Sequence, residues 1–487
     1  MSRNQPLRPQ FHFSAHRHWI NDPNGLVWLE GEYHLFYQHN PFGDQWGHMS
    51  WGHAVSTDLV NWTELEVAIP EDERVSIYSG SVVVDHHNTS GFATGPSPVL
   101  VAIYTGCLRR PEGGQAQELA YSLDRGRTWV KYPGNPVLDL GLRDFRDPKV
   151  LWHEATRQWV MVVVLPDERK ALFYGSPNLR QWHLLSEFDA PLEGQGIWEC
   201  PDLIELNVEA EGTVWMLKVD VLAGHPSGGS GARIFWGQFD GTRFVAQPSE
   251  TVQWADFGSD FYAALSFSHL PTHAHHPVWL AWMNCHRYAQ FLPTHPWRGA
   301  MTLPRELRAR RQQGQLVLCQ WPHPALQQLR RHATHHPGIC LAPKQEHILE
   351  TQDLDTFEIR LQLESCVGGE CAVILSSGSE FTAIGYDAQR AQVFIDRTHA
   401  GFSPAEDRLY AGRRSAPCRV PSASHPLGLQ VWVDRSSVEV FVDDGHTVLS
   451  EQILPTRKRQ ALSLRSSSAQ ATWGPSEIWR LAPAQFA

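Results

Sequence analysis

A short pattern that recurs along the first half of the chain most constrains its fold. A serine at the end of an apolar run is followed by a polar turn and a tryptophan in residues 56–62, 122–129 and 176–182, with a looser copy at 239–244. The copies recur about every 50 to 70 residues, which is room for one four-stranded antiparallel sheet with its loops. Such repetition is typical of a β-propeller, and about five blades fit before residue 320.

The local signals around these copies are also those of strands. Residues 26–29 and 33–37 are apolar runs joined by a Glu30-Gly31 turn, which predicts a hairpin. Long amphipathic helices are not evident, and helices do not alternate with strands, so the pattern gives no support for an α/β fold. We expect an all-β protein with a five-bladed propeller over residues 1–325.

The composition of the sequence changes after this region. Pro322, Pro324 and the polar stretch that follows predict a linker at 326–345 with one or two helical turns. Apolar and polar residues then alternate at 381–386, 391–395 and 429–434, as they do in half-buried strands. We expect a β-sandwich over residues 346–487. Three roles stay open for it: it supports the propeller, binds glycan or forms a homo-oligomer contact.

Composition limits the class of protein and its partners. With 487 residues, of which 42% are hydrophobic, the chain can bury a large core and divide into at least two domains. A net charge of −11 argues against a nucleic-acid partner, because binding a polyanion needs a basic face. No apolar run reaches the length of a signal peptide or a membrane span. We therefore expect no membrane partner and a cytoplasmic location, with export as the alternative if a leader precedes this sequence.

The cysteines and histidines of the chain are not spaced like the ligands of a metal ion. The eight cysteines are scattered without a CxxC pair, so reduced thiols are expected. Neither an HExxH string nor a similar arrangement occurs among the 26 histidines, so we expect no metal and no other cofactor. Most of the 20 tryptophans are expected in the core, although flat rings also suit the faces of sugars.

Three carboxylates that are far apart in the sequence have similar surroundings. Asp22 lies in His18–Gly25, where Asn, Asp, Pro and Gly predict a stiff turn, while Asp147 and Glu199 lie beside Pro or Cys after an aromatic residue. Each acid taken singly has an alternative role in fixing a loop. Because propeller blades present their first strands to a central channel, acids from separate blades can converge there. The three together predict one site.

Paired carboxylates in different protonation states suit glycoside cleavage. Glu199 lies between Trp198 and Cys200, an apolar neighbourhood that favours the protonated acid, so we expect Glu199 to be the general acid/base. Asp22 has asparagine amides on either side, which favour the ionised form and the role of nucleophile.

The third acid has a cation next to it in the sequence. Asp147 directly follows Arg146, whose guanidinium is expected to keep the carboxylate ionised and suited to holding sugar hydroxyls. A structural Arg–Asp pair is the alternative. Cys200 as a thiol nucleophile is a rival hypothesis, but no histidine partner is suggested by the sequence.

Longer strings give the chain a resemblance to a known family. They are HWINDPNG at 18–25, FYQHNP at 36–41, WGHMSWGHA at 46–54, YSGS at 78–81, FRDPK at 145–149, WECPDL at 198–203, DFYAA at 260–264 and PWRGAMTLPREL at 296–307. Over essentially its whole length the sequence resembles glycoside hydrolase family 32, the β-fructosidases that include invertases, levanases and inulinases. The resemblance implies a five-bladed propeller followed by a β-sandwich, and hydrolysis with retention through a covalent fructosyl-enzyme.

The resemblance also implies a role for individual residues. By position in the motifs, Asp22 corresponds to the nucleophile, Glu199 to the acid/base and Asp147 to the stabiliser of the transition state. The positions that line the fructose subsite in similar enzymes are here Asn21, Gln38, Trp46, Tyr78, Ser79, Arg146, Tyr262 and Trp282. For Trp282, an ordinary buried strand position is an equal alternative.

Several strings, including Met49–His53 and residues 88–92, resemble exo-acting fructanases more than sucrose-6-phosphate hydrolases. We expect a retaining exo-acting β-fructofuranosidase that releases terminal fructose from sucrose, fructo-oligosaccharides and the polymers levan or inulin. A narrow cytoplasmic invertase and a fructosyltransferase are alternatives that use the same acids. In a different class, the alternative is a non-catalytic carbohydrate-binding propeller, which would not need carboxylates in opposite protonation states.

Overall fold

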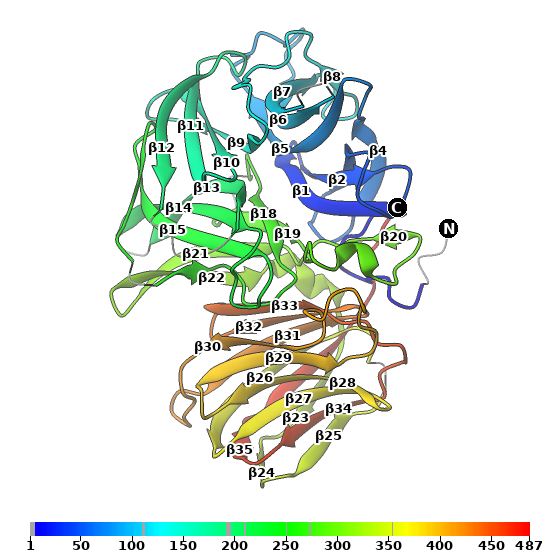
Figure 1. Cartoon of the computed structure of the whole chain (residues 1–487). Coiled ribbons are helices and arrows are strands. Elements are labelled where there is room, and N and C mark those ends of the chain that lie inside the picture. Colours follow the sequence, from blue (N-terminus) through cyan, green and yellow to red (C-terminus); the bar gives the residue numbers. More distant parts are fainter. Residues whose placement is uncertain are drawn as a thin grey trace.

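The computed structural model describes residues 5–109, 113–190, 196–208, 211–249, 251–271, 274–352 and 354–487. Its secondary structure is almost entirely β-strand (Figure 1), and in the described residues the only helices are the short 3-10 helices η1 (Ala289–Phe291) and η2 (Pro324–Leu329). No helix of this part is long and apolar enough to cross a bilayer. The N-terminal sheets form a propeller and the C-terminal sheets a β-sandwich (Figure 1).

Antiparallel groups of strands follow one another along the propeller, and consecutive strands are neighbours in each group. The first two groups are β1 (His18–Leu29), β2 (Glu32–Asn40), β3 (Ser50–Ser56), β4 (Thr63–Ile69), and β5 (Val75–Asp85), β6 (Val99–Leu108), β7 (Gln115–Ser122), β8 (Val130–Lys131). The next two are β9 (Arg146–His153), β10 (Gln158–Leu165), β11 (Lys170–Ser176), β12 (His183–Asp189), and β13 (Trp198–Val208), β14 (Gly212–Val221), β15 (Gly231–Phe239), β16 (Phe244–Ala246). The remaining strands are β17 (Gln253–Trp254), β18 (Tyr262–Ser266), β19 (Val278–Trp282), β20 (Trp297–Arg298), β21 (Arg305–Gln312) and β22 (Gln315–Pro322).

The recurring serine motif is the turn between the third and fourth strands of a group. Ser56, Ser122 and Ser176 end β3, β7 and β11. Each serine hydroxyl accepts a backbone N–H of its own turn at 2.8 Å. In the looser copy, between β15 and β16, the carboxylate of Asp240 accepts two backbone N–H groups instead. The repeat is therefore the local hydrogen bonding of an equivalent loop, which precedes the last strand of each group.

The innermost strands of the propeller close into a ring. β1 contacts β5, β5 contacts β9, β9 contacts β13, β13 contacts β18, and β18 returns to β1. The spaces between adjacent sheets are filled by apolar side chains, such as Val27, Ile77 and Val82 between the first two groups. The ring therefore brings segments that are far apart in the sequence to one central axis.

Distant segments complete the first sheet of the propeller. β20 pairs in parallel with β1. At the opposite edge, the backbone N–H of Glu64 in β4 donates to the carbonyl of Ala487, and the N–H of Ala487 donates to the carbonyl of Trp62. The N–H of Gln485 also donates to the Asn61 side chain, 424 residues away in the sequence.

Two stacked sheets form the C-terminal part. One contains β23 (Arg330–His336), β24 (Ile339–Leu341), β26 (Phe357–Val367), β31 (Leu427–Asp434), β32 (Ser437–Val442), β33 (Thr447–Gln452), β35 (Gln470–Trp473) and β36 (Ser476–Leu481). The other contains β25 (Glu346–Glu350), β27 (Glu370–Ser377), β28 (Glu380–Asp387), β29 (Gln392–His399), β30 (Arg413–Pro417) and β34 (Ala461–Ser466). The segment 326–345, expected to be a linker, contains the last four residues of η2 and also supplies β23 and β24 to the first of these sheets.

Buried charges join the two parts of the molecule. Arg305 of β21 is fully buried and donates to Asp256 Oδ2 at 3.0 Å and to Glu439 Oε2 at 2.5 Å. The ring of His12 lies 2.8 Å from Asp434 and 2.9 Å from Glu439, both of which belong to the sandwich. Ions are stable in a protein interior only when they are paired and hydrogen-bonded, so these contacts fix how the two parts meet.

These contacts predict a pH-dependent stability. Burial alone disfavours the imidazolium, but the carboxylates of Asp434 and Glu439 outweigh it and raise the pKa of His12 from 6.5 to about 9. A raised pKa gives stabilisation that is complete below pH 6.5 and is lost as the pH rises from 6.5 through about 9. We expect the free energy of unfolding to fall across this window by an amount on the order of 3 kcal/mol. Urea unfolding at pH 6 and pH 9 measures it.

His12→Gln is expected to remove the His12 contribution, since an amide does not become charged. This contribution is the difference between the pH dependences of the wild type and the variant, because Asp147, Asp220 and Glu451 have a pKa of about 7 and change charge in the same window. His347→Gln is the matched control, because His347 is exposed on β25. If the His12→Gln variant lost stability between pH 6 and 9 as steeply as the wild type, the assignment to His12 would be wrong.

Candidate active site

Every innermost strand breaks its hydrogen-bond register near the central axis. The breaks lie at Ile20–Pro23 in β1, Ile77–Gly80 in β5, Glu199–Asp202 in β13 and Tyr262–Leu265 in β18, and β9 has one opposite Val162–Val164. Such β-bulges leave a residue without a ladder partner and turn its side chain away from the ordinary alternation. The bulges therefore aim side chains into the space that the ring encloses.

Proline and backbone strain accompany the bulges. Pro23 and Pro148 directly follow Asp22 and Asp147, and proline suits a break in the ladder because it has no N–H to donate. Asp147 and Cys200 adopt left-handed backbone conformations, with φ of 68° and 45°. For residues other than glycine such conformations cost on the order of 1–3 kcal/mol each and persist only where the surrounding structure enforces them.

The segment Asn21–Gly25 is not the stiff turn that its composition predicted. β1 runs through it from His18 to Leu29, with two shifts of register. Gly25 has a φ of +54°, and a Cβ there would lie 2.7 Å from Val82 and 2.8 Å from Phe36. The prediction was wrong because the residues that favour tight turns also favour a bulge within a strand.

The three predicted acids converge on one cavity of about 380 Å³, which Asp22, Asp147 and Glu199 all line. Other predicted residues that line it are Asn21, Gln38, Trp46, Tyr78, Ser79, Arg146 and Trp282. Tyr262 is fully buried and touches the site through Glu199. Four sheets of the propeller contribute to the cavity, so its shape depends on the closed ring.

Neutral donors hold the carboxylate of Asp22. Asn21 Nδ2 donates to Oδ1 at 3.1 Å, and the hydroxyl of Ser79, on β5, donates to Oδ2 at 2.6 Å. Asn21 is itself fixed by Trp19, whose indole N–H donates to its side-chain oxygen at 2.7 Å. These contacts give Asp22 a defined orientation toward the cavity.

Glu199 is held by a cation and a phenol. Arg146 lies 2.9 Å from Oε1, and the Tyr262 hydroxyl donates to Oε2 at 2.5 Å. Burial would raise the pKa of Glu199, but the charges of Arg146 and His286 and the hydrogen bond from Tyr262 outweigh burial and lower it. In the free site, Glu199 is therefore stabilised as a carboxylate.

The pKa of Asp147 is shifted in the opposite direction from that of Glu199. Burial raises its pKa to about 7, against the effect of Arg146, and the negative charges of Glu199 and Asp22 act in the same direction as burial. For the free site, the pKa of Asp147 is raised, contrary to the expectation that Arg146 keeps this acid ionised. The pKa of Glu199 is lowered, contrary to the expectation that Glu199 is the protonated acid. Both side chains line the cavity, but the Arg146 guanidinium bonds Glu199 and Asp144, and burial outweighs its charge at Asp147.

Several residues of the cavity were not predicted from the sequence. They are Trp19, Gln115, Asp144, Ile197, Leu222, His286, Ala289 and Gln290. The ring of His286 packs edge-on against Tyr262, with 4.7 Å between centroids, and against Trp282 at 5.1 Å. The only available signal was its place four residues after the predicted Trp282.

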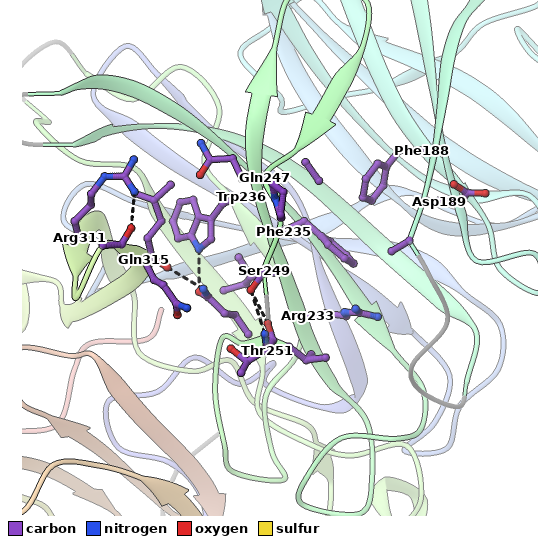
Figure 2. Close-up of a pocket in the computed structure, with 18 residues that line it drawn as sticks. Phe188, Asp189, Arg233, Phe235, Trp236, Gln247, Ser249, Thr251, Arg311 and Gln315 are labelled. Atoms are coloured by element: carbon purple, nitrogen blue, oxygen red, sulfur yellow. Dashed lines mark hydrogen bonds between the residues drawn. The ribbon is translucent and has the colours of Figure 1, made fainter.

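A larger hollow of about 540 Å³ lies on the outer side of the propeller between β12, β15 and the β21–β22 hairpin (Figure 2). Its described lining includes the rings of Phe188, Phe235 and Trp236 but a single carboxylate, that of Asp189. The part of the lining that the structure describes holds no pair of acids, so size does not identify the reactive site. Across the described residues, no cluster of His, Cys, Asp and Glu is arranged to hold a metal ion.

Comparisons with known proteins find a family whose models match most of the chain. Residues 12–322 match the family model described as "Glycosyl hydrolases family 32 N-terminal domain", and residues 325–480 match its C-terminal counterpart. A levanase of Bacillus subtilis is 43% identical over 473 residues, which are 95% of this chain and 69% of the levanase. An extracellular exo-inulinase of Aspergillus awamori is 36% identical over 515 residues, 98% of this chain and 95% of the relative.

Solved structures are similar over the whole chain. The crystal structure of exo-inulinase from Aspergillus awamori has a TM-score of 0.91 at 35% identity, covering 99% of this chain and 100% of that chain. A fructofuranosidase from Schwanniomyces occidentalis complexed with fructose has a TM-score of 0.90 at 31% identity, covering 99% of each chain.

The surroundings of Cys200 predict that its thiol is unreactive. Cys200 Sγ lies 3.5 Å from Asp147 Oδ2 and 3.7 Å from Asp22 Oδ2. Burial, and then the negative charges of these two acids, raise the pKa of the thiol well above its usual value. Because the thiolate is the reactive form, we expect iodoacetamide at pH 8 to leave Cys200 unmodified in the folded protein. Peptide mass spectrometry measures the extent of labelling.

Cys340 serves as the control, because it is exposed and free. It is expected to react in the folded protein, and both residues are expected to react equally in guanidinium chloride. Rapid labelling of Cys200 in the folded protein would revive the hypothesis of a thiol nucleophile.

Proposed function

The chain belongs to glycosyl hydrolase family 32 and is a glycoside hydrolase, and we propose that it is a retaining, exo-acting β-fructofuranosidase. It releases terminal fructose from sucrose, fructo-oligosaccharides and the polymers levan or inulin. The observation that carries this proposal is the convergence of Asp22, Asp147 and Glu199 on a cavity of about 380 Å³. That volume is near the lower end for small-molecule pockets, which suits one terminal sugar unit. Relatives named levanase and exo-inulinase support fructosides as substrates.

In the proposed mechanism, Asp22 attacks the anomeric carbon while Glu199 protonates the leaving oxygen. A fructosyl-enzyme forms on Asp22, and Glu199 then takes a proton from the water that hydrolyses it. Arg146 and Tyr262 favour ionised Glu199, which is the form that the second step needs. Substrate entry removes water from the carboxyl group, and desolvation favours the neutral acid that the first step needs.

The remaining residues are assigned to binding. Asp147 holds fructose hydroxyls and stabilises the transition state, with its Oδ2 fixed by the N–H of Cys200 at 2.9 Å. Asn21 and Ser79 orient the nucleophile. The fructose subsite is lined by Gln38, Trp46, Tyr78, Arg146 and Trp282, and Tyr262 supports it from behind Glu199.

We also propose that the propeller has five blades and spans residues 1–325, followed by a linker at 326–345, whose β23 and β24 pair with the sandwich sheet, and by the sandwich at 346–487. The fifth blade is formed by β18, β19, β21 and β22, which pair in antiparallel order. The change from the N-terminal to the C-terminal family match between residues 322 and 325 supports the first boundary.

The location and assembly of the protein are separate proposals. Eight cysteines without a disulfide support a reducing, cytoplasmic location. Export is the alternative, since related proteins are named extracellular exo-inulinases. The sandwich is the surface proposed for any homo-oligomer contact.

Removing the nucleophile tests the proposal directly. We expect the wild type to release fructose from sucrose, 1-kestose, inulin and levan, and Asp22→Ala to lower kcat by at least about 10⁴-fold, because no covalent intermediate can form. Asp189→Asn is the control, because this exposed acid lies in the larger hollow, and its kcat is expected to be unchanged. Initial rates of fructose release are the measurement.

The same assay separates the alternatives. Turnover of sucrose alone would support a narrow invertase, and accumulation of longer oligosaccharides a fructosyltransferase. A wild-type protein that binds fructosides without releasing fructose would support a carbohydrate-binding propeller. Normal turnover by Asp22→Ala would refute the nucleophile.

Retention predicts the anomer of the first product. Two successive displacements at the same carbon preserve its configuration, so β-fructofuranose is expected before mutarotation. Proton NMR in the first moments of the reaction measures it. If α-fructofuranose appeared first, the double displacement would be excluded.

A further inference from the structure

We propose that Arg397, which belongs to the C-terminal sandwich, is a positioning residue for the active site of the propeller. It holds the two propeller segments that bring Tyr262 and His286 against Glu199. This inference deepens the proposed function and rests on it. It gives the sandwich a specific part in the reaction in addition to supporting the propeller.

Arg397 is fully buried and every nitrogen of its guanidinium has a partner. Its partners are Asp260 Oδ2 at 2.6 Å, Gln452 O at 2.7 Å, Tyr288 Oη at 2.9 Å, Tyr410 O at 2.6 Å and Glu451 Oε2 at 2.8 Å. Asp260 and Tyr288 belong to the propeller, whereas the other three belong to the sandwich. The planar fork of the guanidinium thus fixes the direction of the contact between the two parts as well as their separation.

The first propeller segment leads to the hydroxyl on Glu199. Asp260 lies two residues before Tyr262, a span of roughly 7 Å in an extended chain. Its carboxylate also accepts the N–H of Gln452 at 2.8 Å and the hydroxyl of Tyr288 at 2.6 Å. The next residues enter β18, where Ala263 has a left-handed φ of 54° beside the bulge. A strained segment of this kind keeps its shape only if its ends are held, and Arg397 holds one end.

The second propeller segment leads to the histidine that lines the cavity. Tyr288 lies two residues after His286, and Ala289 and Gln290, which follow it, also line the cavity. The ring of His286 packs on Tyr262 at 4.7 Å between centroids. Arg397 therefore meets both segments at equivalent distances along the chain, and the two side chains that it aligns touch each other beside Glu199.

A purely stabilising role would not require this arrangement. A buried ion pair is weak evidence for stability, because apolar residues of similar volume can replace it with little loss. Directional hydrogen bonds to two catalytic segments instead fix geometry, and a misplacement of about 1 Å can cost on the order of 10²-fold in rate.

The proposal is tested with Arg397→Gln, Arg397→Lys and Tyr288→Phe in the full-length chain. We expect Arg397→Gln to lower kcat on sucrose by about 10- to 100-fold while KM changes by less than about 3-fold. Arg397→Lys keeps the charge near Asp260 and is expected to recover part of kcat. Tyr288→Phe removes one hydroxyl and is expected to lower kcat less, so it remains informative if the arginine variants do not fold.

Arg330→Gln is the matched control. Arg330, on β23, donates to both oxygens of Glu358 on β26, and this ion pair lies within the sandwich. The variant is expected to lose stability while retaining the wild-type kcat. If Arg397 acts through Tyr262, Arg397→Gln combined with Tyr262→Phe should have a kcat within about 3-fold of the lower single variant, because effects on one interaction are not additive.

A crystal structure of Arg397→Gln, or of Tyr288→Phe, provides a readout that does not depend on the substrate. The Tyr262 hydroxyl is expected to move out of hydrogen-bonding distance of Glu199, and to stay in place in Arg330→Gln. Folded Arg397 variants with wild-type kcat and an intact Tyr262–Glu199 contact would overturn the positioning role. Inactivity of the wild type on every fructoside would instead overturn the proposed function, and the structures would still decide the positioning.

Discussion

The site depends on one departure from regular sheet structure, the interruption of the hydrogen-bond ladder on each innermost strand. A regular strand would turn successive side chains to alternate faces, and it would not aim acids from neighbouring sheets at a single point. Bulges at β1, β9 and β13 do so, at the expense of left-handed backbone at Asp147 and Cys200. The close packing of the ring supplies the stability that keeps these strained residues in place.

The charges beside the acids explain how similar carboxylates acquire different properties. Arg146 bonds Glu199, while Asp22 receives hydrogen bonds from neutral donors and Asp147 is buried near the negative charges of Glu199 and Asp22. The sandwich extends this arrangement, because Arg397 acts on the segments behind Glu199 from outside the propeller. Residues of both the propeller and the sandwich thus position the side chains of the active site.

Much of this was predictable from the sequence, and the failures have physical reasons. The serine turns predicted the succession of sheets because each copy makes the same local hydrogen bonds, and acid–proline pairs indicated the site because proline suits a broken ladder. The directions of the two pKa shifts were predicted wrongly, because burial outweighs the charge of Arg146 at Asp147, while Arg146 bonds Glu199, which is distant in the sequence. His286 was missed because loop packing brings it to Glu199, and neither spacing nor periodicity encodes that contact.

The way the first sheet is completed has a consequence for synthesis. Residues 485–487 cover the outer edge of β4. Asn61, in the loop before β4, is bonded by Gln485, which lies 424 residues further along the chain. Synthesis of those residues takes roughly 20 to 85 s at the ribosomal rate. During that time the edge is open to pairing with other nascent chains. Glu64 and Glu66 alternate along this strand, and negative charges on an open edge oppose such pairing. These glutamates oppose pairing along an edge that residues 485–487 cover in the folded chain.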